Sequence, residues 1–202
     1  MKHQSTRALY AYWNEQRRNR RAPDRADIDP AAIRHTLGDT FMLASDFADQ
    51  LRFRLAGTKV CALFCREIKG EAFNALWNES SVQPVEELLT IVANESVGAV
   101  AGLTGRTDDG SVAELEILLL PLVHAGRARV RALGVMAPLV PPYWLGEKPL
   151  VELELGALRH IGPQLETAGA PRFGLAPVAG RQRHGFMVYN GGREVPSEER
   201  TG

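Results

Sequence analysis

The stretch from Leu51 to Trp77, LRFRLAGTKVCALFCREIKGEAFNALW, decides how this chain folds. Its first residues alternate, with apolar side chains facing one way and two arginines the other, which is the pattern of a half-buried strand. Gly57 interrupts the alternation, and two apolar triplets at i, i+3, i+4 spacing then predict short helices. The alternating residues are Leu51, Phe53 and Leu55, and the triplets are Val60, Leu63 and Phe64, then Phe73, Leu76 and Trp77. We therefore expect a strand followed directly by short helices that lie across a sheet.

Hydrophobic periodicity predicts further helices and strands on both sides of this stretch. Apolar residues at helical spacing predict one helix over Ser5–Arg20 and another over Pro84–Glu95, with Ser80 or Ser81 before the second. The other predicted elements are a short helix at Pro30–Leu37, strands at Asp39–Ser45, Leu51–Ala56, Val97–Thr104, Ala113–Leu120 and around Val130 and Ala132, and an edge strand or extended arm at Val151–Leu155. The predicted fold class is α+β: a five-stranded antiparallel sheet with short cap helices inserted after its second strand.

Charged residues alternate with apolar ones on the last two of the five strands. Glu114 and Glu116 occupy one face of the first of these strands, and Arg129 and Arg131 occupy one face of the second. We expect the arginines to lie opposite the glutamates across an antiparallel pair, where each ion pair would contribute about 0.2–1 kcal/mol.

The composition is that of one ordinary globular domain. The chain has 202 residues, of which 45% are hydrophobic and 24% charged, so a sizeable core is expected. Basic and acidic residues number 24 each, and a formal net charge of zero argues against a nucleic-acid-binding protein. No apolar run reaches the roughly 18 residues of a membrane helix, and residues 1–6 lack the core of a signal peptide. We expect a cytoplasmic protein without a membrane or nucleic-acid partner.

Several short motifs follow one another in an order that resembles a known family. They are Tyr12-Trp13, Pro23-x-Arg25 with Asp29-Pro30, Arg54-Leu55-Ala56-Gly57-Thr58, Arg66-Glu67 with Gly70, the LLLPL run Leu118–Leu122, and Tyr189-Asn190-Gly191-Gly192-Arg193. With the order of strand, short helix and cap, they make most of the chain resemble a PAS domain, and more narrowly a proteobacterial family of single-PAS-domain proteins formerly regarded as a domain of unknown function. Cys65 departs from the family pattern, because a glycine is expected before Arg66-Glu67.

The resemblance implies a division of the chain and a broad role. We expect an N-terminal flanking helix at residues 1–22, a PAS-like core at 23–137, a C-terminal extension packed on or beside the core at 138–193, and a disordered tail at 194–202. Pro138–Pro149 is too rich in proline for regular structure. The family implies a regulatory or sensory module of bacterial signal transduction and implies no particular ligand.

Three groups of residues are candidates for binding. Ligands of PAS domains lie between the sheet and the cap helices, and there the candidate pocket residues are Phe53, Phe64, Phe73, Trp77, Leu89 and Leu115. The same regular spacing also fits an ordinary core, which is the more economical interpretation. Arg54 is a candidate anchor for an anionic ligand or a partner's carboxylate, with a surface ion pair as the alternative. Leu9, Tyr12 and Trp13 form either a dimer interface or a face packed on the domain, and the sequence leaves both open.

Signals for catalysis are weak throughout the chain. Cys61 and Cys65 lie four residues apart without a second Cys/His pair, so structural thiols are favoured over metal or redox sensing. Arg17 and Arg21 form the RxxxR half of a cyclic-dinucleotide motif, but its second half does not follow, and the helix dipole explains the basic cluster. No phosphate loop, serine elbow or zinc-protease motif is present.

The function expected from the sequence is therefore regulatory. We expect a stand-alone module that acts through protein–protein contacts, as a homodimer with a protein partner, in which a partner or ligand shifts the docking of the N-terminal helix. A small-molecule sensor is the first alternative, and a small α+β enzyme with an unrecognised site is the second. The primary expectation is that the protein is not an enzyme and holds no metal, and no cofactor can be named.

Overall fold

The computed structural model describes residues 1–45, 50–123, 131–161, 181–183 and 186–188. The chain forms two compact units, Met1–Gln164 and Leu165–Gly202. In the second unit β7 (Arg181–Arg183) and β8 (Phe186–Val188) pair antiparallel.

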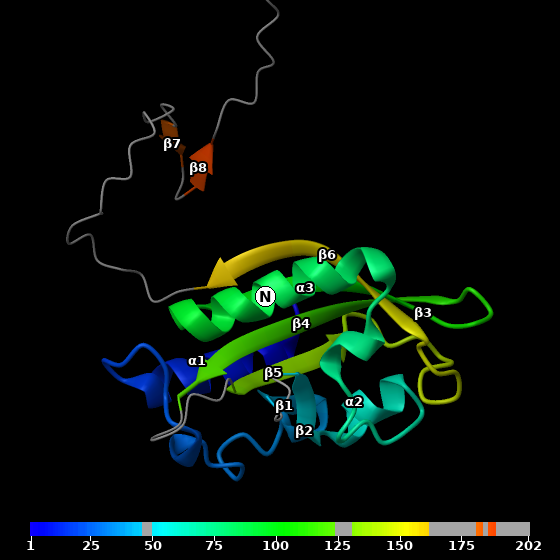
Figure 1. Cartoon of the computed structure of the whole chain (residues 1–202), viewed down its shortest axis with the longest axis horizontal. Coiled ribbons are helices and arrows are strands. Elements are labelled where there is room, and N and C mark those ends of the chain that lie inside the picture. Colours follow the sequence, from blue (N-terminus) through cyan, green and yellow to red (C-terminus); the bar gives the residue numbers. More distant parts are fainter. Residues whose placement is uncertain (46–49, 124–130, 162–180, 184–185, 189–202) are drawn as a thin grey trace, which may run out of the picture. The chain divides into compact units, whose positions relative to one another are not determined.

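The first unit is built on a sheet of six described strands (Figure 1). In chain order they are β1 (Thr40–Ser45), β2 (Leu51–Ala56), β3 (Gly98–Arg106), β4 (Val112–Leu122), β5 (Arg131–Pro138) and β6 (Glu152–Ile161). The strands lie in the order β2-β1-β5-β4-β3-β6, and each neighbouring pair is antiparallel. The predicted α+β class and the antiparallel sheet are confirmed, and β6 joins the five expected strands as an edge strand.

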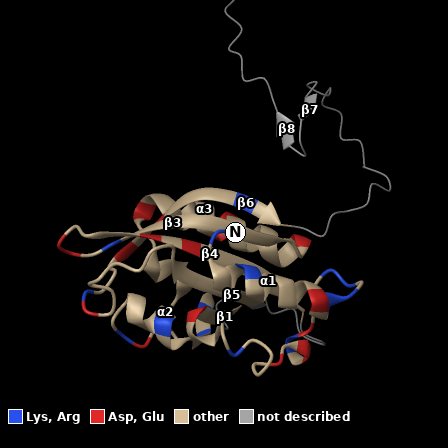
Figure 2. Ribbon diagram, turned by 180° about the vertical axis from the view of Figure 1, so that it is seen from behind, with Lys and Arg blue, Asp and Glu red and all other residues tan. Residues whose placement is uncertain are grey.

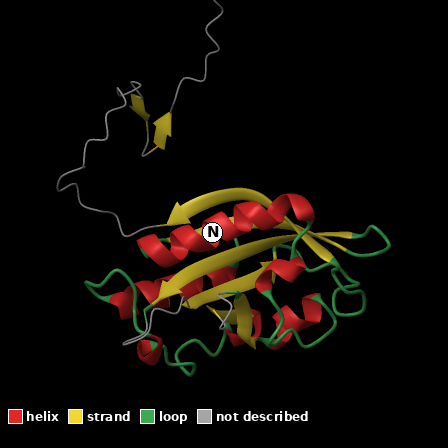
Figure 3. Cartoon of the chain, in the orientation of Figure 1, coloured by secondary structure: helices red, strands yellow, loops and turns green. Residues whose placement is uncertain are grey.

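One face of the sheet, here called the front face, carries the segments between β2 and β3. They are α2 (Thr58–Leu63), the 3-10 helix η3 (Phe73–Leu76) and α3 (Glu79–Glu95). Figure 3 shows α3 lying along the sheet. Alternate strand residues and the apolar faces of these helices form one buried cluster, so burial of apolar surface holds the cap on the sheet.

The opposite face, here called the back face, carries α1 (Gln4–Arg17), which Figure 2 shows from that side. Leu9 and Trp13 of α1 are buried in a second apolar cluster with residues of β4 and β5 such as Leu118 and Val135. Two 3-10 helices, η1 (Arg25–Asp27) and η2 (Leu37–Asp39), lead from α1 to β1. The sheet is therefore the middle of three layers.

Two predicted helices differ from the observed ones at their starts. The helix expected from Pro84 begins at Glu79, and the Asn78 side chain caps it by accepting a hydrogen bond from the Ser81 amide. Pro84 lies inside the helix, so proline was a misleading start signal there. Residues 30–36 form successive turns instead of the predicted helix, with short-range bonds such as that from the Thr36 amide to the Ile33 carbonyl.

The strand β2 contains a bulge that reverses its predicted alternation. Leu43 of β1 pairs with Phe53, and Met42 pairs with Leu55, which leaves Arg54 without an opposite residue. An extra residue in one strand turns the following side chains to the other side. Leu55 is consequently 44% exposed, and the prediction that it faces the same way as Phe53 is wrong.

The last two strands do not pair in the register that would set Arg131 opposite either glutamate. Arg131 lies opposite Leu122, and Glu116 lies opposite Ala137. Arg129 is outside the described residues. Arg131 lies at one end of the β4–β5 pairing and Glu116 lies near the other end, so the predicted register was wrong.

The loop between β5 and β6 is irregular but anchored, as its proline content predicts. Residues 139–151 form turns, and Trp144 and Leu150 reach into the front-face cluster with 5% and 1% of their surface exposed. The loop therefore holds β6 against β3 and completes the sheet.

Candidate functional site

The structure brings the six predicted pocket residues together on the front face. Phe53, Phe64, Phe73, Trp77, Leu89 and Leu115 are all buried in one cluster. The Phe73 ring centroid lies 5.6 Å from that of Phe53, 5.5 Å from that of Trp77 and 6.0 Å from that of Phe41. These are contact distances for aromatic rings. In this conformation the six residues form the packed core that the sequence offered as their more economical interpretation.

One polar atom in this cluster lacks a hydrogen-bond partner. Trp77 is 7% exposed, and its indole Nε1 finds no acceptor among the described residues. Buried donors are normally paired, because an unpaired one loses its bond to water without replacement. Nε1 is thus the point in the front-face core where an acceptor atom of a small molecule would gain a hydrogen bond.

Arg54 lies apart from the pocket residues. It occupies the β2 bulge with an exposed side chain, and no ion pair or hydrogen bond joins that side chain to another residue in the described part of the chain. A bulge projects its extra residue out of the regular strand, so the guanidinium is accessible to an anion from outside. The predicted anchor role stays a prediction.

The three predicted interface residues belong to the chain's own core or its edge. Leu9 and Trp13 have 0% and 1% of their surface exposed, and the Trp13 indole Nε1 donates to the Pro121 carbonyl at 2.9 Å. Tyr12 is half-buried, and its hydroxyl donates to the Asp27 carbonyl and accepts from the Asp29 amide. Packing against the domain accounts for the burial of Leu9 and Trp13 within one chain, and the predicted interface role of these residues stays a prediction.

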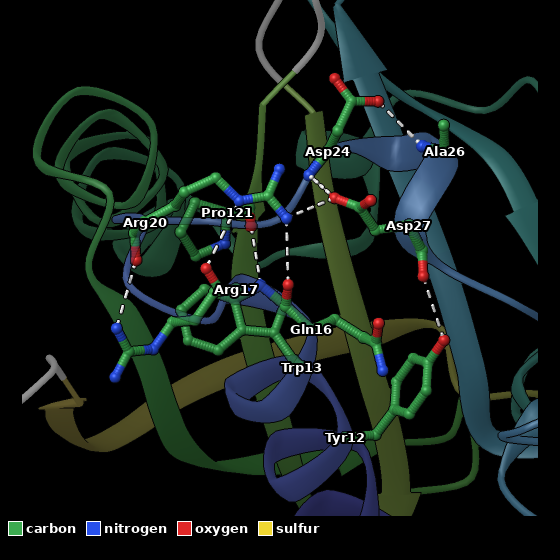
Figure 4. A network of polar contacts seen from close by, with 9 residues as sticks. All are labelled: Tyr12, Trp13, Gln16, Arg17, Arg20, Asp24, Ala26, Asp27 and Pro121. Atoms are coloured by element: carbon green, nitrogen blue, oxygen red, sulfur yellow. Dashed lines mark hydrogen bonds and ion pairs between the residues drawn. The ribbon is translucent and has the colours of Figure 1, made fainter.

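The basic cluster at the end of α1 is tied down by hydrogen bonds (Figure 4). The Arg20 guanidinium donates to Asp27 Oδ2 at 2.6 Å and to the Gln16 carbonyl, and the Arg17 guanidinium lies 5.9 Å from the centre of a Trp13 ring. The hydrogen bond from Arg20, followed by that from the Asp24 amide, lowers the pKa of Asp27. The contact between Arg20 and Asp27 therefore holds the C-terminal end of α1 on η1.

A buried carboxylate that the sequence placed on a solvent-facing strand face holds the other end of α1. Glu116 is 5% exposed and accepts hydrogen bonds from the amides of Lys2 at 2.6 Å and His3 at 2.9 Å. Burial raises the pKa of Glu116, but the hydrogen bonds from the Lys2 and His3 amides outweigh it and leave the pKa below its ordinary value. The only hint in the sequence is that Glu116 shares the alternation of Leu118 and Leu120, which cover the same face.

A second buried carboxylate connects the back face with the cap. Asp39 is 2% exposed, and its Oδ2 accepts a hydrogen bond from the Ser5 hydroxyl of α1 at 2.6 Å and from Lys59 Nζ of α2 at 3.3 Å. Asp39 lies where η2 meets β1, at a sheet end that both α1 and α2 reach. Sequence patterns did not reveal this role, because its two partners are 34 and 20 residues away.

The two cysteines lie on the cap in different environments. Cys61 is half-buried, and burial followed by the neighbouring Glu67 carboxylate raises the pKa of its thiol. Cys65 is exposed and has a φ of 50°, a left-handed conformation that glycine adopts without cost. The expectation of a glycine at this position is thereby explained. No group of three metal-binding side chains exists in the described part of the chain.

Next to Cys65, Arg66 fixes the closure of the cap. Its Nε and a terminal nitrogen donate to the two oxygens of Glu71 at 3.0 and 2.9 Å. The Glu71 carbonyl in turn accepts from the Phe53 amide of β2. The Arg66-Glu67 motif with Gly70 is therefore a structural clasp between cap and sheet.

Among the helices that the structure describes, none is long and apolar enough to cross a membrane.

Comparison with known proteins adds a family to this geometry. No curated protein matches the chain. Solved structures similar to it include a PAS domain of a protein from Colwellia psychrerythraea, with 16% identity, a TM-score of 0.40 and coverage of 55% of this chain and 97% of the other. A fungal LOV-domain photoreceptor has 14% identity and a TM-score of 0.39, and the match covers 56% of this chain and 94% of the other. The aureochrome1 LOV domain has 15% identity and a TM-score of 0.40, and the match covers 56% of this chain and 83% of the other. A sequence model described as PAS domain matches residues 1–137, two thirds of the chain, so this protein belongs to the PAS-domain family.

Proposed function

We propose that the chain is a sensory or regulatory module that acts through protein–protein contacts, and that the docking of α1 on the sheet is its output. Membership of the PAS-domain family supports a sensory module. The proposal includes a cytoplasmic location, a protein partner and no catalytic role. It names no cofactor.

The observation that carries the proposal is the position of Asp39 between the two faces. One carboxylate oxygen receives a hydrogen bond from Ser5 of α1 and another from Lys59 of α2. A movement of α2 that withdraws Lys59 leaves a buried carboxylate with one partner fewer, which changes how strongly it holds Ser5. A change at the cap is thus felt at the N-terminal end of α1.

The energies involved suit a switch. Hydrogen bonds to charged groups contribute about 1.5–3 kcal/mol each. The N-terminal end of α1 rests on two such carboxylates, Asp39 and Glu116. A shift of about 1–3 kcal/mol changes the ratio of two conformations by roughly 5- to 150-fold, so the loss of one contact is enough to alter α1 docking.

A double-mutant cycle between the two helices tests this coupling. Ser5→Ala and Lys59→Ala are measured singly and together by urea unfolding. Because both residues bond the same oxygen, their effects should differ from additivity by at least about 0.5 kcal/mol.

A second cycle provides the control. Lys148 pairs with Asp109, away from α1, so Ser5→Ala and Lys148→Ala should add within about 0.3–0.5 kcal/mol. If the effects of Ser5→Ala and Lys59→Ala on the free energy of unfolding are additive, the cap and α1 are not coupled through Asp39, and the proposed output is contradicted.

A ligand-gated sensor is a second candidate, and the unpartnered Trp77 Nε1 favours it. A small molecule that accepts a hydrogen bond there would have to displace part of the aromatic cluster. Native mass spectrometry of freshly purified protein should then find a bound molecule that Trp77→Phe loses. If every preparation shows only the mass of the chain without a ligand, this candidate function is ruled out.

A further inference from the structure

The two outer strands of the sheet differ in how their outer edges are covered. β2 and β6 lie at the two ends of the strand order (Figure 1). The cap closes the outer edge of β2, because the Phe53 amide donates to the Glu71 carbonyl at 3.0 Å and the Gly70 amide donates to the Phe53 carbonyl at 2.8 Å. An uncovered outer strand presents a row of backbone N–H and C=O groups with which another strand can pair.

The first half of β6 is also covered. The Asn78 amide donates to the Leu153 carbonyl at 2.9 Å, and the Leu155 amide donates to the Ser81 hydroxyl oxygen at 2.9 Å. Both contacts come from the segment in which α3 begins. The start of α3 therefore closes the edge of β6 as far as Leu155.

A bulge separates this covered half from the second half of β6. Ala101 of β3 pairs with Leu158, and Leu103 of β3 pairs with Leu155. The two residues of β6 between these pairs therefore lie opposite the single residue Gly102. A bulge bends its strand, and here it lies at the point where the cover from α3 stops.

From the bulge onward the edge of β6 is open. Residues 156–160 are all exposed, although successive strand residues point to opposite faces, so both faces of β6 are accessible there. Among the described residues, no hydrogen bond from outside the pair of β3 and β6 reaches residues 156–161. Because the residues of an antiparallel strand alternate in the side to which they bond, about half of these N–H and C=O groups point away from β3. We call residues 156–161 the open edge.

The open edge carries two exposed basic side chains, those of Arg159 and His160, and no acidic residue. The exposed Lys2 side chain lines a groove together with Arg159, and Glu116 lines the same groove. Glu116 is 5% exposed, and its two oxygens already accept the Lys2 and His3 amides, so the exposed charges along this groove are positive. A second copy of β6 would bring like charges to the edge, whereas an acidic segment brings opposite ones.

We propose that the open edge of β6 pairs with an extended, acidic segment of a partner protein, which adds a strand to the sheet. In such strand addition the backbone hydrogen bonds supply affinity, and alternate side chains supply specificity. An acidic residue of the segment lies opposite Arg159, and its apolar neighbour lies opposite Leu158, which is 40% exposed. The inference rests on the proposed function for the existence of a protein partner, and it deepens that function by giving the partner a docking site outside α1.

The probe is a short synthetic peptide in which glutamate alternates with valine, and a lysine–valine peptide of equal length is its control. Fluorescence anisotropy with the full chain should show that the acidic peptide binds at least about fivefold more tightly. Arg159→Glu should reverse this preference. Arg54→Glu, which changes an exposed arginine on the edge strand that the cap covers, should leave both affinities unchanged. Failure of the wild-type chain to bind the acidic peptide, or an unchanged preference in Arg159→Glu, overturns the inference.

Methylation of the peptide backbone separates strand pairing from charge attraction. An added strand turns only one of its two edges to β6, so the acidic peptide is made in two further forms, with N-methyl groups on the glutamates or on the valines. One form should lose measurable binding, because its methyl groups face β6, and the other should keep the affinity of the unmodified peptide. Equal affinity of the two forms contradicts the addition of a strand.

Amide hydrogen exchange of the full chain locates the contact. Without peptide, the outward amides of the open edge should exchange rapidly, and the acidic peptide should slow their exchange while the amides of β2 stay unchanged. Full protection of the open edge without peptide overturns the inference, and protection that grows with protein concentration assigns the edge to a second copy instead. None of these results affects the Ser5–Lys59 cycle, which is measured within one chain and without peptide.

Discussion

At the scale of single residues, three positions carry contacts or conformations that their sequence neighbours do not reveal. Cys65 adopts a left-handed backbone, and Asp39 and Glu116 are buried carboxylates whose partners lie in distant segments. The family pattern drew attention to Cys65 because a glycine is expected there. Nothing comparable marked the two carboxylates, because alternation alone does not tell a solvent-facing strand face from one covered by another segment.

Replacing Cys65 by glycine should stabilise the protein. A non-glycine residue in the left-handed region costs roughly 1–2 kcal/mol, part of which is offset by the greater freedom of glycine in the unfolded chain. We expect Cys65→Gly to raise the free energy of unfolding by about 0.5–1 kcal/mol in urea titrations. Cys65→Ala keeps the strained backbone and serves as the control, with a change within about 0.5 kcal/mol. Equal effects of the two substitutions would show that the side chain matters and the backbone does not.

Replacing Glu116 by glutamine should destabilise the protein in a pH-dependent way. The pKa of Glu116 is lower in the folded chain than its ordinary value of 4.5, so its charged form stabilises the fold above pH 4.5 and this contribution is lost as the pH falls through the folded value. At pH 7 we expect Glu116→Gln to lose about 1.5–3 kcal/mol of unfolding free energy, with the difference from wild type shrinking in acid. Glu114→Gln, on an exposed neighbour, should change it by less than about 0.5 kcal/mol. If the difference in unfolding free energy between wild type and Glu116→Gln stays constant from pH 7 to pH 3, the stabilising role of the Glu116 carboxylate is contradicted.

At the scale of elements, the sequence predicted which helices and strands exist better than it predicted where they begin and in which register the strands pair. β2 was predicted with its observed bounds, Leu51–Ala56, because its alternation is clean and glycine follows it. The bulge at Arg54 escaped prediction, since it depends on how the partner strand pairs. The start of α3 was misplaced because Pro84 competes with Asn78, and only the observed cap bond to Ser81 decides between them.

Two glycines within strands should respond oppositely to alanine. A Cβ at Gly134 of β5 would lie 2.3 Å from Cζ of Phe41 and 2.6 Å from the Leu118 carbonyl, so Gly134→Ala must push a buried ring aside. We expect it to lower the free energy of unfolding by about 1–3 kcal/mol. Gly102→Ala meets open space and should raise it by about 0.5–1 kcal/mol, because alanine is the better strand residue. Urea unfolding of the pair checks both, and a loss at Gly102 equal to that at Gly134 would contradict the packing described.

At the scale of the whole molecule, the three layers explain where the candidate site residues lie. The six aromatic and aliphatic candidates converge on the front face because strand alternation and helix spacing both point there, and periodicity is visible in sequence. The apolar stripe of α1 alone did not show whether the helix packs on its own domain or on a second protein. An amphipathic helix needs an apolar surface to pack on, but its sequence does not specify which protein provides that surface. Within the described chain, the stripe packs on the domain's own sheet, in the second cluster around Trp13. Asp39 then joins the outer layers across the end of the sheet.

The loop that carries Trp144 and Leu150 has a practical consequence for anyone who shortens this protein. The family match stops at residue 137, yet the sheet ends only with β6 at Ile161. A fragment trimmed to the family boundary would lose Trp144, Leu150 and Leu153 from the front-face core and would strip β3 of its outer neighbour. Bare strand edges recruit other chains, so such a fragment should precipitate or form fibres during expression, whereas one that extends to residue 161 should stay in solution.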